Sequence, residues 1–396
     1  MKVKSYHQIK NLDQKTVLIR VDFNVALEKG KVKEAFKIKA SLPLLDDLIR
    51  RGSKLILVTH LGDPTLTKSG NVKSADRLKY STKVLAQYLT KNLRIKCSFS
   101  DKKIGSDALR KQIEQLKSGQ VILLENIRFY AGETANAKTF SKQLASLADV
   151  YINNAFAVSH REHASVSRVM KYLPSFAGPL VELELLNLNK VLKPVKPLVA
   201  IIGGAKIDTK VSLIKSLSKK AEWLIVGGAL ANNFISAKGL AVGKSLVTDK
   251  GIKIAKKLLR KNIILPTDVV VQDQKSQQVR IKQIDQVLSN EMILDLGPET
   301  MKRIHTLIKT AQTIIWNGPM GKFEDERFRF GTFFVARAVA TKASGKAYAV
   351  VGGGETVEAV NLSHSAEQID WISTGGGASL AYLSGDKMPG LKGLIK

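Results

Sequence analysis

The sequence predicts an α/β protein made of two doubly wound, parallel-sheet (Rossmann-like) domains, joined by a hinge helix with a cleft between them. Three observations support this. Short β-branched runs alternate with helical segments, a pattern typical of parallel sheets covered by helices on both faces. The alternation stops near residue 178 and starts again near residue 198. At 396 residues, the chain is also longer than one hydrophobic core usually supports.

The first half alternates strand-like runs with segments of helical periodicity. Apolar residues recur at helical spacing over 37–50, where Pro43 lies near the start and is tolerated in a first turn. A polar loop is expected at 65–74. Further helices are expected at 78–89 and 140–147. The strands of this half are expected at 16–21, 54–59, 121–125 and 150–152.

A break in the pattern separates the halves. Pro174 and the pair Gly178-Pro179 interrupt the alternation, and we interpret the helix that follows as an inter-domain connector. The expected strands of the second half are 198–202, 223–226, 263–265, 313–316, 350–351 and 371–374. The expected domains are 1–176, with the tail 381–396 packing back on it, and 177–380, which includes the connector 179–192.

Composition narrows the class of protein. The single cysteine, Cys97, excludes a disulfide scaffold and fits a reducing cytoplasm. No apolar run reaches the length of a membrane span, and no secretory signal opens the chain. The net charge of +29 is spread over both halves, which is typical of a solvated surface. Such a charge also steers acidic metabolites toward the protein.

Polar and cationic side chains follow the predicted strands of the first half. In parallel sheets, ligands gather at the carboxyl ends of the strands, so these side chains are expected at one edge. They are Asp22, Asn24, His60, Arg128, His160, Arg161 and His163. Each alone is explained as a loop residue, but their recurrence at equivalent positions favours a site for a small, multiply charged anion. His160 and His163 are open to a second interpretation as a general-base pair.

Glycines follow the predicted strands of the second half. The clearest case is 348–360, a strand followed by three glycines and a helix that opens on Glu355-Thr356. A helix N-terminus after glycines suits a phosphate, and a carboxylate there suits Mg²⁺. The alternative is a tight turn without a ligand, which the recurrence at 203–204, 227–228 and 375–377 makes less favourable. Lys206 and Lys210 lie four residues apart, hence on one face, and no P-loop motif is present.

Six motifs together resemble the phosphoglycerate kinase family, in its order and over essentially the whole chain. They are Arg20-Val-Asp-Phe-Asn-Val25, His60-Leu-Gly62, Leu124-Glu-Asn-Ile-Arg-Phe-Tyr130, Gly203-Gly-Ala-Lys206, Trp316-Asn-Gly-Pro-Met-Gly321 and Ser373-Thr-Gly-Gly-Gly-Ala-Ser379. The resemblance implies a glycolytic, hinge-bending, cytoplasmic monomer. It would transfer the acyl phosphate of 1,3-bisphosphoglycerate to Mg-ADP, giving 3-phosphoglycerate and ATP, with Mg²⁺ as cofactor and no specific nucleic-acid or membrane partner.

The resemblance also implies a role for individual residues. The catalytic residues are Arg20, Lys206, Gly376 and Gly377. The phosphoglycerate residues are Asp22, Phe23, Asn24, Lys37, His60, Leu61, Gly62, Asp63, Arg128 and Arg161. The nucleotide residues are Lys210, Gly228, Asn317, Glu324, Gly353, Gly354, Glu355 and Thr356, and Glu355 is also the expected metal ligand.

Four positions depart from the family pattern. Asp63 stands where the family has a substrate-holding arginine, and Lys68 or Lys73 on the adjacent loop are candidates to restore the charge. Lys37 replaces an arginine and loses its bidentate fork. Asn154 and Glu355 each replace an aspartate, the latter at the metal.

These departures leave a second hypothesis. It is a weakened or inactive relative of the kinases that binds nucleotides or polyanions through its positive charge. The retained lysines and glycine loops favour the enzyme.

Overall fold

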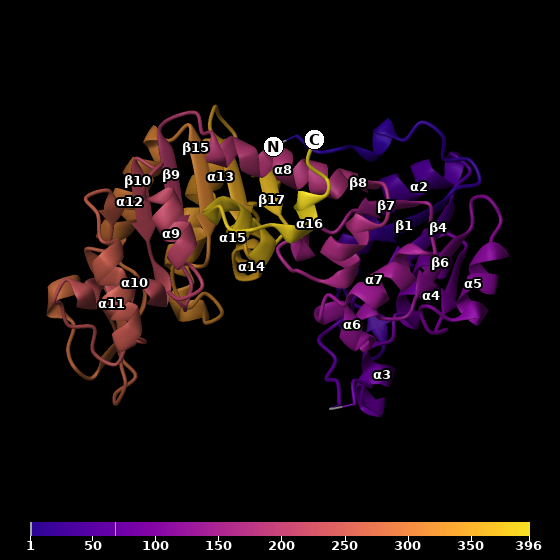
Figure 1. Ribbon diagram of the computed structural model, residues 1–396. Coiled ribbons are helices and arrows are strands. Elements are labelled where there is room, and N and C mark those ends of the chain that lie inside the picture. The colour runs from indigo at the N-terminus through magenta and orange to yellow at the C-terminus, as the bar shows by residue number, and fades with distance from the viewer. Residues whose placement is uncertain (1, 68) are drawn as a thin grey trace. The chain divides into compact units, whose positions relative to one another are not determined.

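The computed structural model describes residues 2–67 and 69–396, and the chain divides into two compact units (Figure 1). The first unit runs to Leu185 and also includes Met388–Lys396, and the second is Leu186–Lys387. Helix α8 (Pro179–Leu192) therefore begins in the first unit and ends in the second. Within the described chain, no helix combines the length and apolarity needed to cross a membrane.

The first unit is built on a six-stranded parallel sheet with strand order β5-β6-β4-β1-β7-β8. The strands are β1 (Thr16–Arg20), β4 (Lys54–Val58), β5 (Cys97–Ser100), β6 (Val121–Leu124), β7 (Val150–Asn153) and β8 (Ser175–Ala177). A small antiparallel hairpin pairs β2 (Leu27–Glu28) with β3 (Lys31–Val32). The helices are α1 (Phe36–Lys39), α2 (Leu42–Arg50), α3 (Ser74–Tyr80), α4 (Lys83–Leu93), α5 (Asp107–Glu114), α6 (Ala131–Thr134) and α7 (Lys138–Ala145).

Alternate residues of these strands feed two cores, one on each face of the sheet. Ile19 of β1 joins a core with side chains of α2 and α4, whereas its neighbour Leu18 joins a core with side chains of α5 and α7. Both faces are therefore covered, which explains why β-branched and leucine residues form continuous apolar runs in β4 and β6. Cys97 of β5 packs against the first of these cores, and burial raises the pKa of its thiol to about 12.

The C-terminal residues are tied to the first unit by backbone hydrogen bonds. The N–H of Gly390 in α16 (Pro389–Lys392) donates to Ser159 O at 2.8 Å, and Lys4 N–H donates to Leu394 O at 2.7 Å. The amide of Asn153 donates to Gly390 O at 2.9 Å. The last residues thus support the loop that follows β7.

The second unit contains another six-stranded parallel sheet, with strand order β11-β10-β9-β15-β16-β17. The strands are β9 (Leu198–Ile202), β10 (Trp223–Val226), β11 (Ile263–Ile264), β15 (Thr313–Asn317), β16 (Tyr348–Gly352) and β17 (Trp371–Ser373). The helices are α9 (Val211–Leu217), α10 (Gly228–Ala237), α11 (Asp249–Leu258), α12 (Pro298–Thr310), α13 (Phe330–Ala343), α14 (Gly354–Leu362) and α15 (Gly377–Ser384). The predicted fold class, with two parallel-sheet domains, is confirmed.

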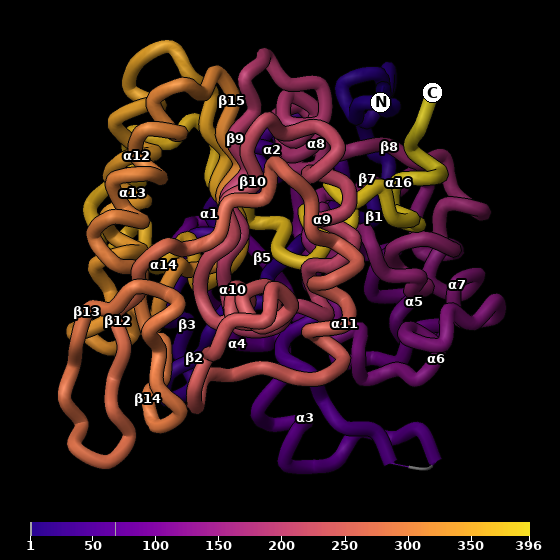
Figure 2. Tube along the Cα trace, turned by 90° about the vertical axis from the view of Figure 1, so that its left-hand side faces the viewer, coloured from indigo at the N-terminus to yellow at the C-terminus, as the bar shows by residue number. Residues whose placement is uncertain are grey.

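The second unit also contains a three-stranded antiparallel sheet that the sequence analysis did not predict. Its strands β12 (Asp268–Asp273), β13 (Val279–Gln283) and β14 (Glu291–Leu296) pair in the order β13-β12-β14 (Figure 2). Val269 and Val271 form a small core with Val287 on one side of this sheet. The sheet supplies one wall of the pocket described below.

Two predicted helices are each divided in the structure. The segment 37–50 forms α1 and α2, because Pro43 has no N–H to donate to the carbonyl of Lys39, where α1 ends, and its ring clashes with that carbonyl. The segment 78–89 is interrupted between α3 and α4. There Thr82 N–H and the Ser81 hydroxyl both donate to the carboxylate of Glu125 at 2.8 Å, a tertiary contact that periodicity does not reveal.

Candidate functional site

The parallel register brings the polar strand ends of the first unit to one edge. Arg20 pairs with Val58 on one side and with Asn153 on the other, so β1, β4 and β7 end at the same level. The residues that follow these strands, together with the turn after β6, therefore share this edge. The first unit thus assembles the predicted anion-binding set from four separate segments.

Arg20 is the buried centre of this set. Its side chain is only 2% exposed, and three of its groups are hydrogen-bonded. Nε donates to Ser165 Oγ at 3.1 Å, Nη1 to Val21 O at 2.6 Å, and Nη2 lies 3.2 Å from His60 Nδ1. Burial lowers the pKa of Arg20. Burial, and then Arg20, lower the pKa of His60 well below its usual value, so His60 is neutral and its Nδ1 accepts.

The buried carboxylate of Glu133 contacts Arg20 indirectly, through Ser165. Glu133 Oε1 accepts from the Ser165 hydroxyl at 2.6 Å, and Oε2 accepts from Ser165 N–H at 2.8 Å. Burial raises the pKa of Glu133, whereas the charge of Arg20 lowers it. Sequence reasoning missed both Glu133 and Ser165, because the contact joins residues 32 apart in the chain and follows no local spacing.

Arg128 is the second buried cation, and it already has an anionic partner. Its side chain is 8% exposed, and Nη1 donates to Gly62 O at 2.7 Å and to Asp63 Oδ1 at 2.9 Å. The side chain of Asp63 is 93% exposed. Asp63, which stands where an arginine was expected, thus pairs with Arg128. Of the two candidates to restore the charge, Lys68 lies outside the described residues, and Lys73 is exposed directly before α3.

Further contacts fix the loops around these cations. Lys37 Nζ lies 2.9 Å from Asp22 Oδ2, so this lysine is also paired with a carboxylate. Asn24 Oδ1 accepts from Gly62 N–H at 2.8 Å. Gly62 has φ +62°, and a Cβ there would lie 2.2 Å from the ring of Tyr80, so only glycine fits.

The remaining residues that the sequence analysis singled out in the first unit differ in burial and in what their side chains contact. The side chains of Phe23 and Leu61 are buried, so only their backbone is available at the edge. Arg161 is exposed. His163 Nδ1 lies 3.8 Å from Glu133 Oε1, and burial lowers its pKa to about 4. Asn154 is buried and structural, because its Oδ1 accepts from Leu180 N–H at 3.0 Å near the start of α8.

In the second unit, glycines allow three strand ends to pack backbone against backbone. A Cβ on Gly203 would lie 2.0 Å from Pro319 O, and one on Gly228 would lie 2.7 Å from the same oxygen. Gly318 has φ +95°, and its Cβ would lie 2.2 Å from Gly203 O. The turns after β9, β10 and β15 therefore form one closely packed backbone floor.

Asn317 and Thr356 join this floor to α14. Asn317 Nδ2 donates to Gly352 O at 2.6 Å, and Gly318 N–H donates to Thr356 Oγ1 at 2.6 Å. Asn317 Oδ1 is buried without a hydrogen-bond partner in the part of the chain that the structure describes. Gly353 has φ +98°, a conformation that favours glycine.

Two helix N-termini and two lysines complete this edge. A Cβ added to Gly354 at the start of α14, or to Gly376 before Gly377 in α15, would meet nothing within 4 Å. Glu355 is exposed in the first turn of α14. Burial lowers the pKa of Lys210 to about 8, and the charge of Glu355 opposes this shift. Lys206 is exposed on the same loop.

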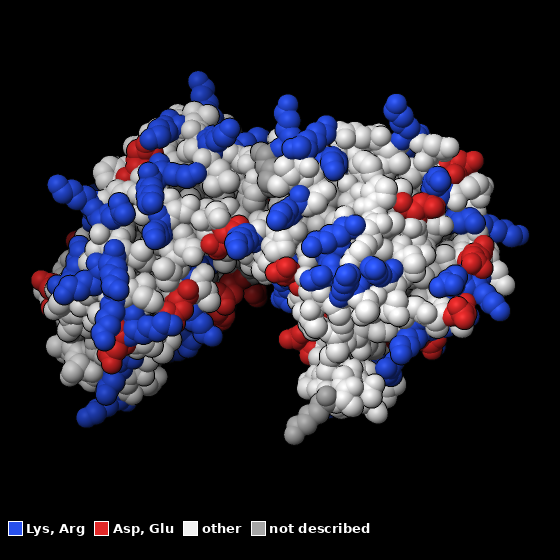
Figure 3. Space-filling view, viewed as in Figure 1, with Lys and Arg blue, Asp and Glu red and all other residues white. Residues whose placement is uncertain are grey.

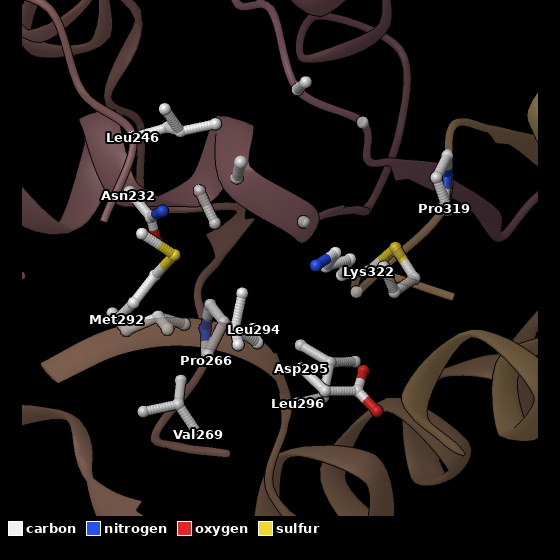
Figure 4. A pocket seen from close by; sticks show the side chains of 18 of the residues that line it. Asn232, Leu246, Pro266, Val269, Met292, Leu294, Asp295, Leu296, Pro319 and Lys322 are labelled. Atoms are coloured by element: carbon white, nitrogen blue, oxygen red, sulfur yellow. The ribbon is translucent and has the colours of Figure 1, made fainter. Parts of the chain in front are cut away.

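A pocket of about 450 Å³ lies beside these turns (Figure 4). Its walls come from the turns after β9, β10 and β15, from α10, and from β14 of the antiparallel sheet. The lining includes Gly204, Gly228, Asn232, Leu246, Pro266, Val269, Met292, Leu296, Pro319, Lys322, Glu324 and Glu355. Apolar residues predominate in this lining, which also includes the polar or charged Asn232, Lys322, Glu324 and Glu355.

The donors suit a metal held jointly with a ligand. Among residues 2–67 and 69–396, no group of three or more His, Cys, Asp or Glu side chains is arranged to hold a metal ion. Mg²⁺ bound through one carboxylate and the phosphates of a nucleotide needs no such group. Glu355 at an open helix N-terminus fits that mode.

Charge on the surface is not confined to these edges. Lys and Arg side chains lie over both units on the face shown in Figure 3, with acidic residues among them. The positive excess is thus distributed on this face, as the sequence indicates.

Comparisons with known proteins cover nearly the whole chain. The family model described as Phosphoglycerate kinase matches residues 7–386. The phosphoglycerate kinase of Borrelia garinii subsp. bavariensis is 41% identical over 409 residues, which span 100% of both chains. That of Trichodesmium erythraeum is 42% identical over 394 residues, 97% of this chain and 96% of the relative. The solved phosphoglycerate kinase of Coxiella burnetii has a TM-score of 0.86 at 36% identity, covering 99% of this chain and 98% of its own.

Proposed function

The chain belongs to the phosphoglycerate kinase family and is a phosphotransferase of glycolysis, and from this premise we propose which residues carry each part of the reaction. The first unit binds the phosphoglycerate, and the second binds the nucleotide. The observation that carries this division is the contrast between the two strand-end edges. One edge gathers buried cations, and the other exposes glycine turns and helix N-termini beside a largely apolar pocket.

In the first unit, the acidic substrate is held by cations around Arg20. Arg128, Arg161 and Lys37 supply charge to the phosphate and carboxylate groups. His60 is held neutral with Nδ1 directed to Arg20, so its Nε2–H is free to donate. Asp22 and Asn24 fix the adjacent loops, and Phe23, Leu61 and Gly62 contribute through the backbone. The Asp63 carboxylate pairs with Arg128.

In the second unit, nucleotide phosphates are received by backbone and lysine. Gly353, Gly354 and Thr356 begin α14, whose free N–H groups and positive dipole end attract phosphate. Lys210 adds a charge, and Asn317 presents an unpartnered buried oxygen to this loop within the described residues. Gly228 and Glu324 border the pocket, which we assign to base and ribose.

Transfer breaks the bond between phosphorus and the acyl oxygen, which leaves as the 3-phosphoglycerate carboxylate, and forms a bond to the terminal oxygen of ADP. Such a reaction requires positioning and charge neutralisation more than a protein nucleophile. Arg20, Lys206, and the N–H groups at Gly376 and Gly377 stabilise the transferring group. Glu355 would hold Mg²⁺ jointly with the nucleotide, and the ion would supply positive charge to neutralise the phosphates.

The decisive experiment is a coupled assay with ATP, Mg²⁺ and 3-phosphoglycerate. Turnover of the wild-type protein should require all three, and Lys206→Ala should lower kcat by about 10²–10³-fold. Lys219→Ala, a change of another lysine in the same unit, is the control and should retain activity. Turnover unaffected by Lys206→Ala would contradict the assignment. Neither the fold nor the comparisons favour the alternative of a binding protein without activity.

We further propose that the protein acts as a cytoplasmic monomer. The absence of a membrane-spanning helix in the described residues is compatible with this location. Size-exclusion chromatography with light scattering tests the monomer: a single species near 43.4 kDa is expected. A species of twice that mass would contradict it.

A further inference from the structure

Helix α3 contributes no buried residue, yet it is tied to the anion-binding edge of the first unit. Figure 1 shows it at the lower end of this unit. Thr65 N–H, in the segment after β4, donates to Asp76 Oδ2 on α3 at 2.8 Å. Asn126 Nδ2, in the turn after β6, donates to Tyr80 O at 2.9 Å. The first and last turns of the helix are therefore both held beside strand ends.

Arg77 on this helix has a guanidinium that is oriented but not used within the chain. It lies over the ring of Phe129, 5.2 Å from the ring centroid, and Phe129 directly follows Arg128. Among residues 2–67 and 69–396, the exposed side chain of Arg77 has no ion-pair or hydrogen-bond partner. Stacking uses the flat face of a guanidinium and leaves its in-plane N–H groups free to bind an anion.

Two other cations of the same edge are already paired with carboxylates of the chain. Arg128 Nη1 lies 2.9 Å from Asp63 Oδ1, and Lys37 Nζ lies 2.9 Å from Asp22 Oδ2. An arriving anion must compete with these carboxylates, whereas at Arg77 it meets no such competitor in the described chain. The edge therefore offers a phosphate less positive charge than its number of cations indicates, unless Arg77 adds to it.

A pocket of about 690 Å³ joins α3 to this edge. Its lining includes Asn24, Leu61, Gly62, Arg77, Lys79 and Lys83, of which the first three belong to the proposed phosphoglycerate site. Three cations in a concave site raise its positive potential. The carboxylate of Glu125, which also lines the pocket, accepts from the Ser81 hydroxyl and from Thr82 N–H, both at 2.8 Å. The pocket is thus suited to the anionic end of a small metabolite.

We infer that Arg77 binds the 3-phosphate of the substrate, the phosphate that is not transferred, and supplies the positive charge that Asp63 does not. This inference rests on the proposed function, which places phosphoglycerate in the first unit. Arg20 is assigned to the transferring group at the carboxyl end of the substrate. A cation outside the buried Arg20 network then meets the opposite end, which carries the 3-phosphate. The fork of an arginine binds two oxygens of such a phosphate at once.

The test compares the wild type with Arg77→Gln, which keeps a long polar side chain but removes the charge. The KM for 3-phosphoglycerate should rise by about tenfold, the low end of the range for a hydrogen bond to a charged group, because the site is exposed. The KM for ATP and kcat should stay at the wild-type values, since Arg77 does not touch the transferring group. An unchanged KM for 3-phosphoglycerate overturns the inference.

Arg110→Gln is the matched control, because Arg110 is an exposed arginine of α5 whose loss changes the net charge equally. Its KM for 3-phosphoglycerate should remain that of the wild type. A purely structural role of Arg77 in holding α3 is tested by adding Asp63→Arg. The new cation should lower the KM by a larger factor in Arg77→Gln than in the wild type, because it replaces the missing charge. Equal factors in the two backgrounds overturn the inference.

Calorimetry separates this inference from the proposed function. Binding of 3-phosphoglycerate to the free protein should be about tenfold weaker in Arg77→Gln, even if the coupled assay shows no turnover. Equal binding by both proteins overturns this inference alone, whereas no binding by the wild type overturns the assignment of the first unit as well. Inorganic phosphate should compete with 3-phosphoglycerate less effectively in the variant. Equal competition in both proteins would show that Arg77 does not bind the phosphate group.

Discussion

The two units position the proposed ligand-binding groups at the same edge of similar sheets, but by different physical means. In the first unit, side-chain charges lie at the strand ends and are oriented by a buried network of Glu133, Ser165, Arg20 and His60. In the second, glycines bring backbone into close contact and leave helix N-termini open. Charged side chains can adjust to a small acidic ligand, whereas closely packed backbone holds one fixed shape. The two edges should therefore respond differently to mutation.

The sharpest test of the backbone floor is Gly203→Ala. The new Cβ would lie 2.0 Å from Pro319 O, a backbone atom that cannot rotate away. We expect the free energy of unfolding to fall by about 3 kcal/mol, the upper part of the range for overpacking. Gly354→Ala is the matched control, because its Cβ meets nothing within 4 Å. Denaturant unfolding should leave that control near the wild type; equal losses in both variants would contradict a close-packed floor.

The corresponding test of the charge network is Ser165→Ala. Removing the hydroxyl leaves Arg20 Nε and Glu133 Oε1 without this partner in a buried site, which should cost about 1–3 kcal/mol of stability. Because Arg20 loses its orientation, kcat should fall more than the KM for 3-phosphoglycerate rises. Ser141→Ala is the control: its hydroxyl donates within α7 to Ala137 O, which also accepts from Ser141 N–H. Stability loss without a change in kcat would reduce Ser165 to a structural residue.

The sequence predicted the residues at the strand ends more completely than the contacts that support them. Residues at or just after strand ends, such as Arg20, His60 and Asn317, could be predicted because fully buried parallel strands appear in the sequence as continuous apolar runs. The network beneath them was missed, since Ser165 and Glu133 meet only through the fold. The antiparallel sheet was missed although Val279 and Ile281 alternate with Arg280 and Lys282 in β13, because this signal is only five residues long and its apolar side chains are exposed.

A pH profile tests Lys210, a partly buried lysine at the backbone edge. Burial places the pKa of Lys210 at about 8, so this cation is present below that pH and is lost above it. The value of kcat/KM for the nucleotide reports the free enzyme and should fall by about tenfold by pH 9. Lys210→Arg should move the fall beyond the accessible range, because arginine remains charged. A wild-type profile that is flat to pH 9.5 would show that the charge of Lys210 is not needed.

The smallest expected effect concerns the exposed carboxylate of the first unit. Asp63 Oδ1 lies 2.9 Å from Arg128 Nη1, so an arriving substrate anion competes with an anion that the chain itself supplies. Since Asp63 is largely exposed, water and salt weaken the pair, and Asp63→Asn should lower the KM for 3-phosphoglycerate by only about 2- to 5-fold. Asp63→Arg, which adds a cation, should lower it further.

Asp107→Asn separates this local competition from the change in net charge. Asp107 is exposed on α5 and pairs with Arg110 at 3.6 Å, so its loss adds the same charge without touching Arg128. Its KM should stay at the wild-type value, and the advantage of Asp63→Asn should shrink as salt is raised. If Asp63→Asn leaves KM unchanged at low salt, the carboxylate does not compete with the substrate. Arg128 would then bind both at once through different N–H groups, and the first edge would be as fixed in shape as the second.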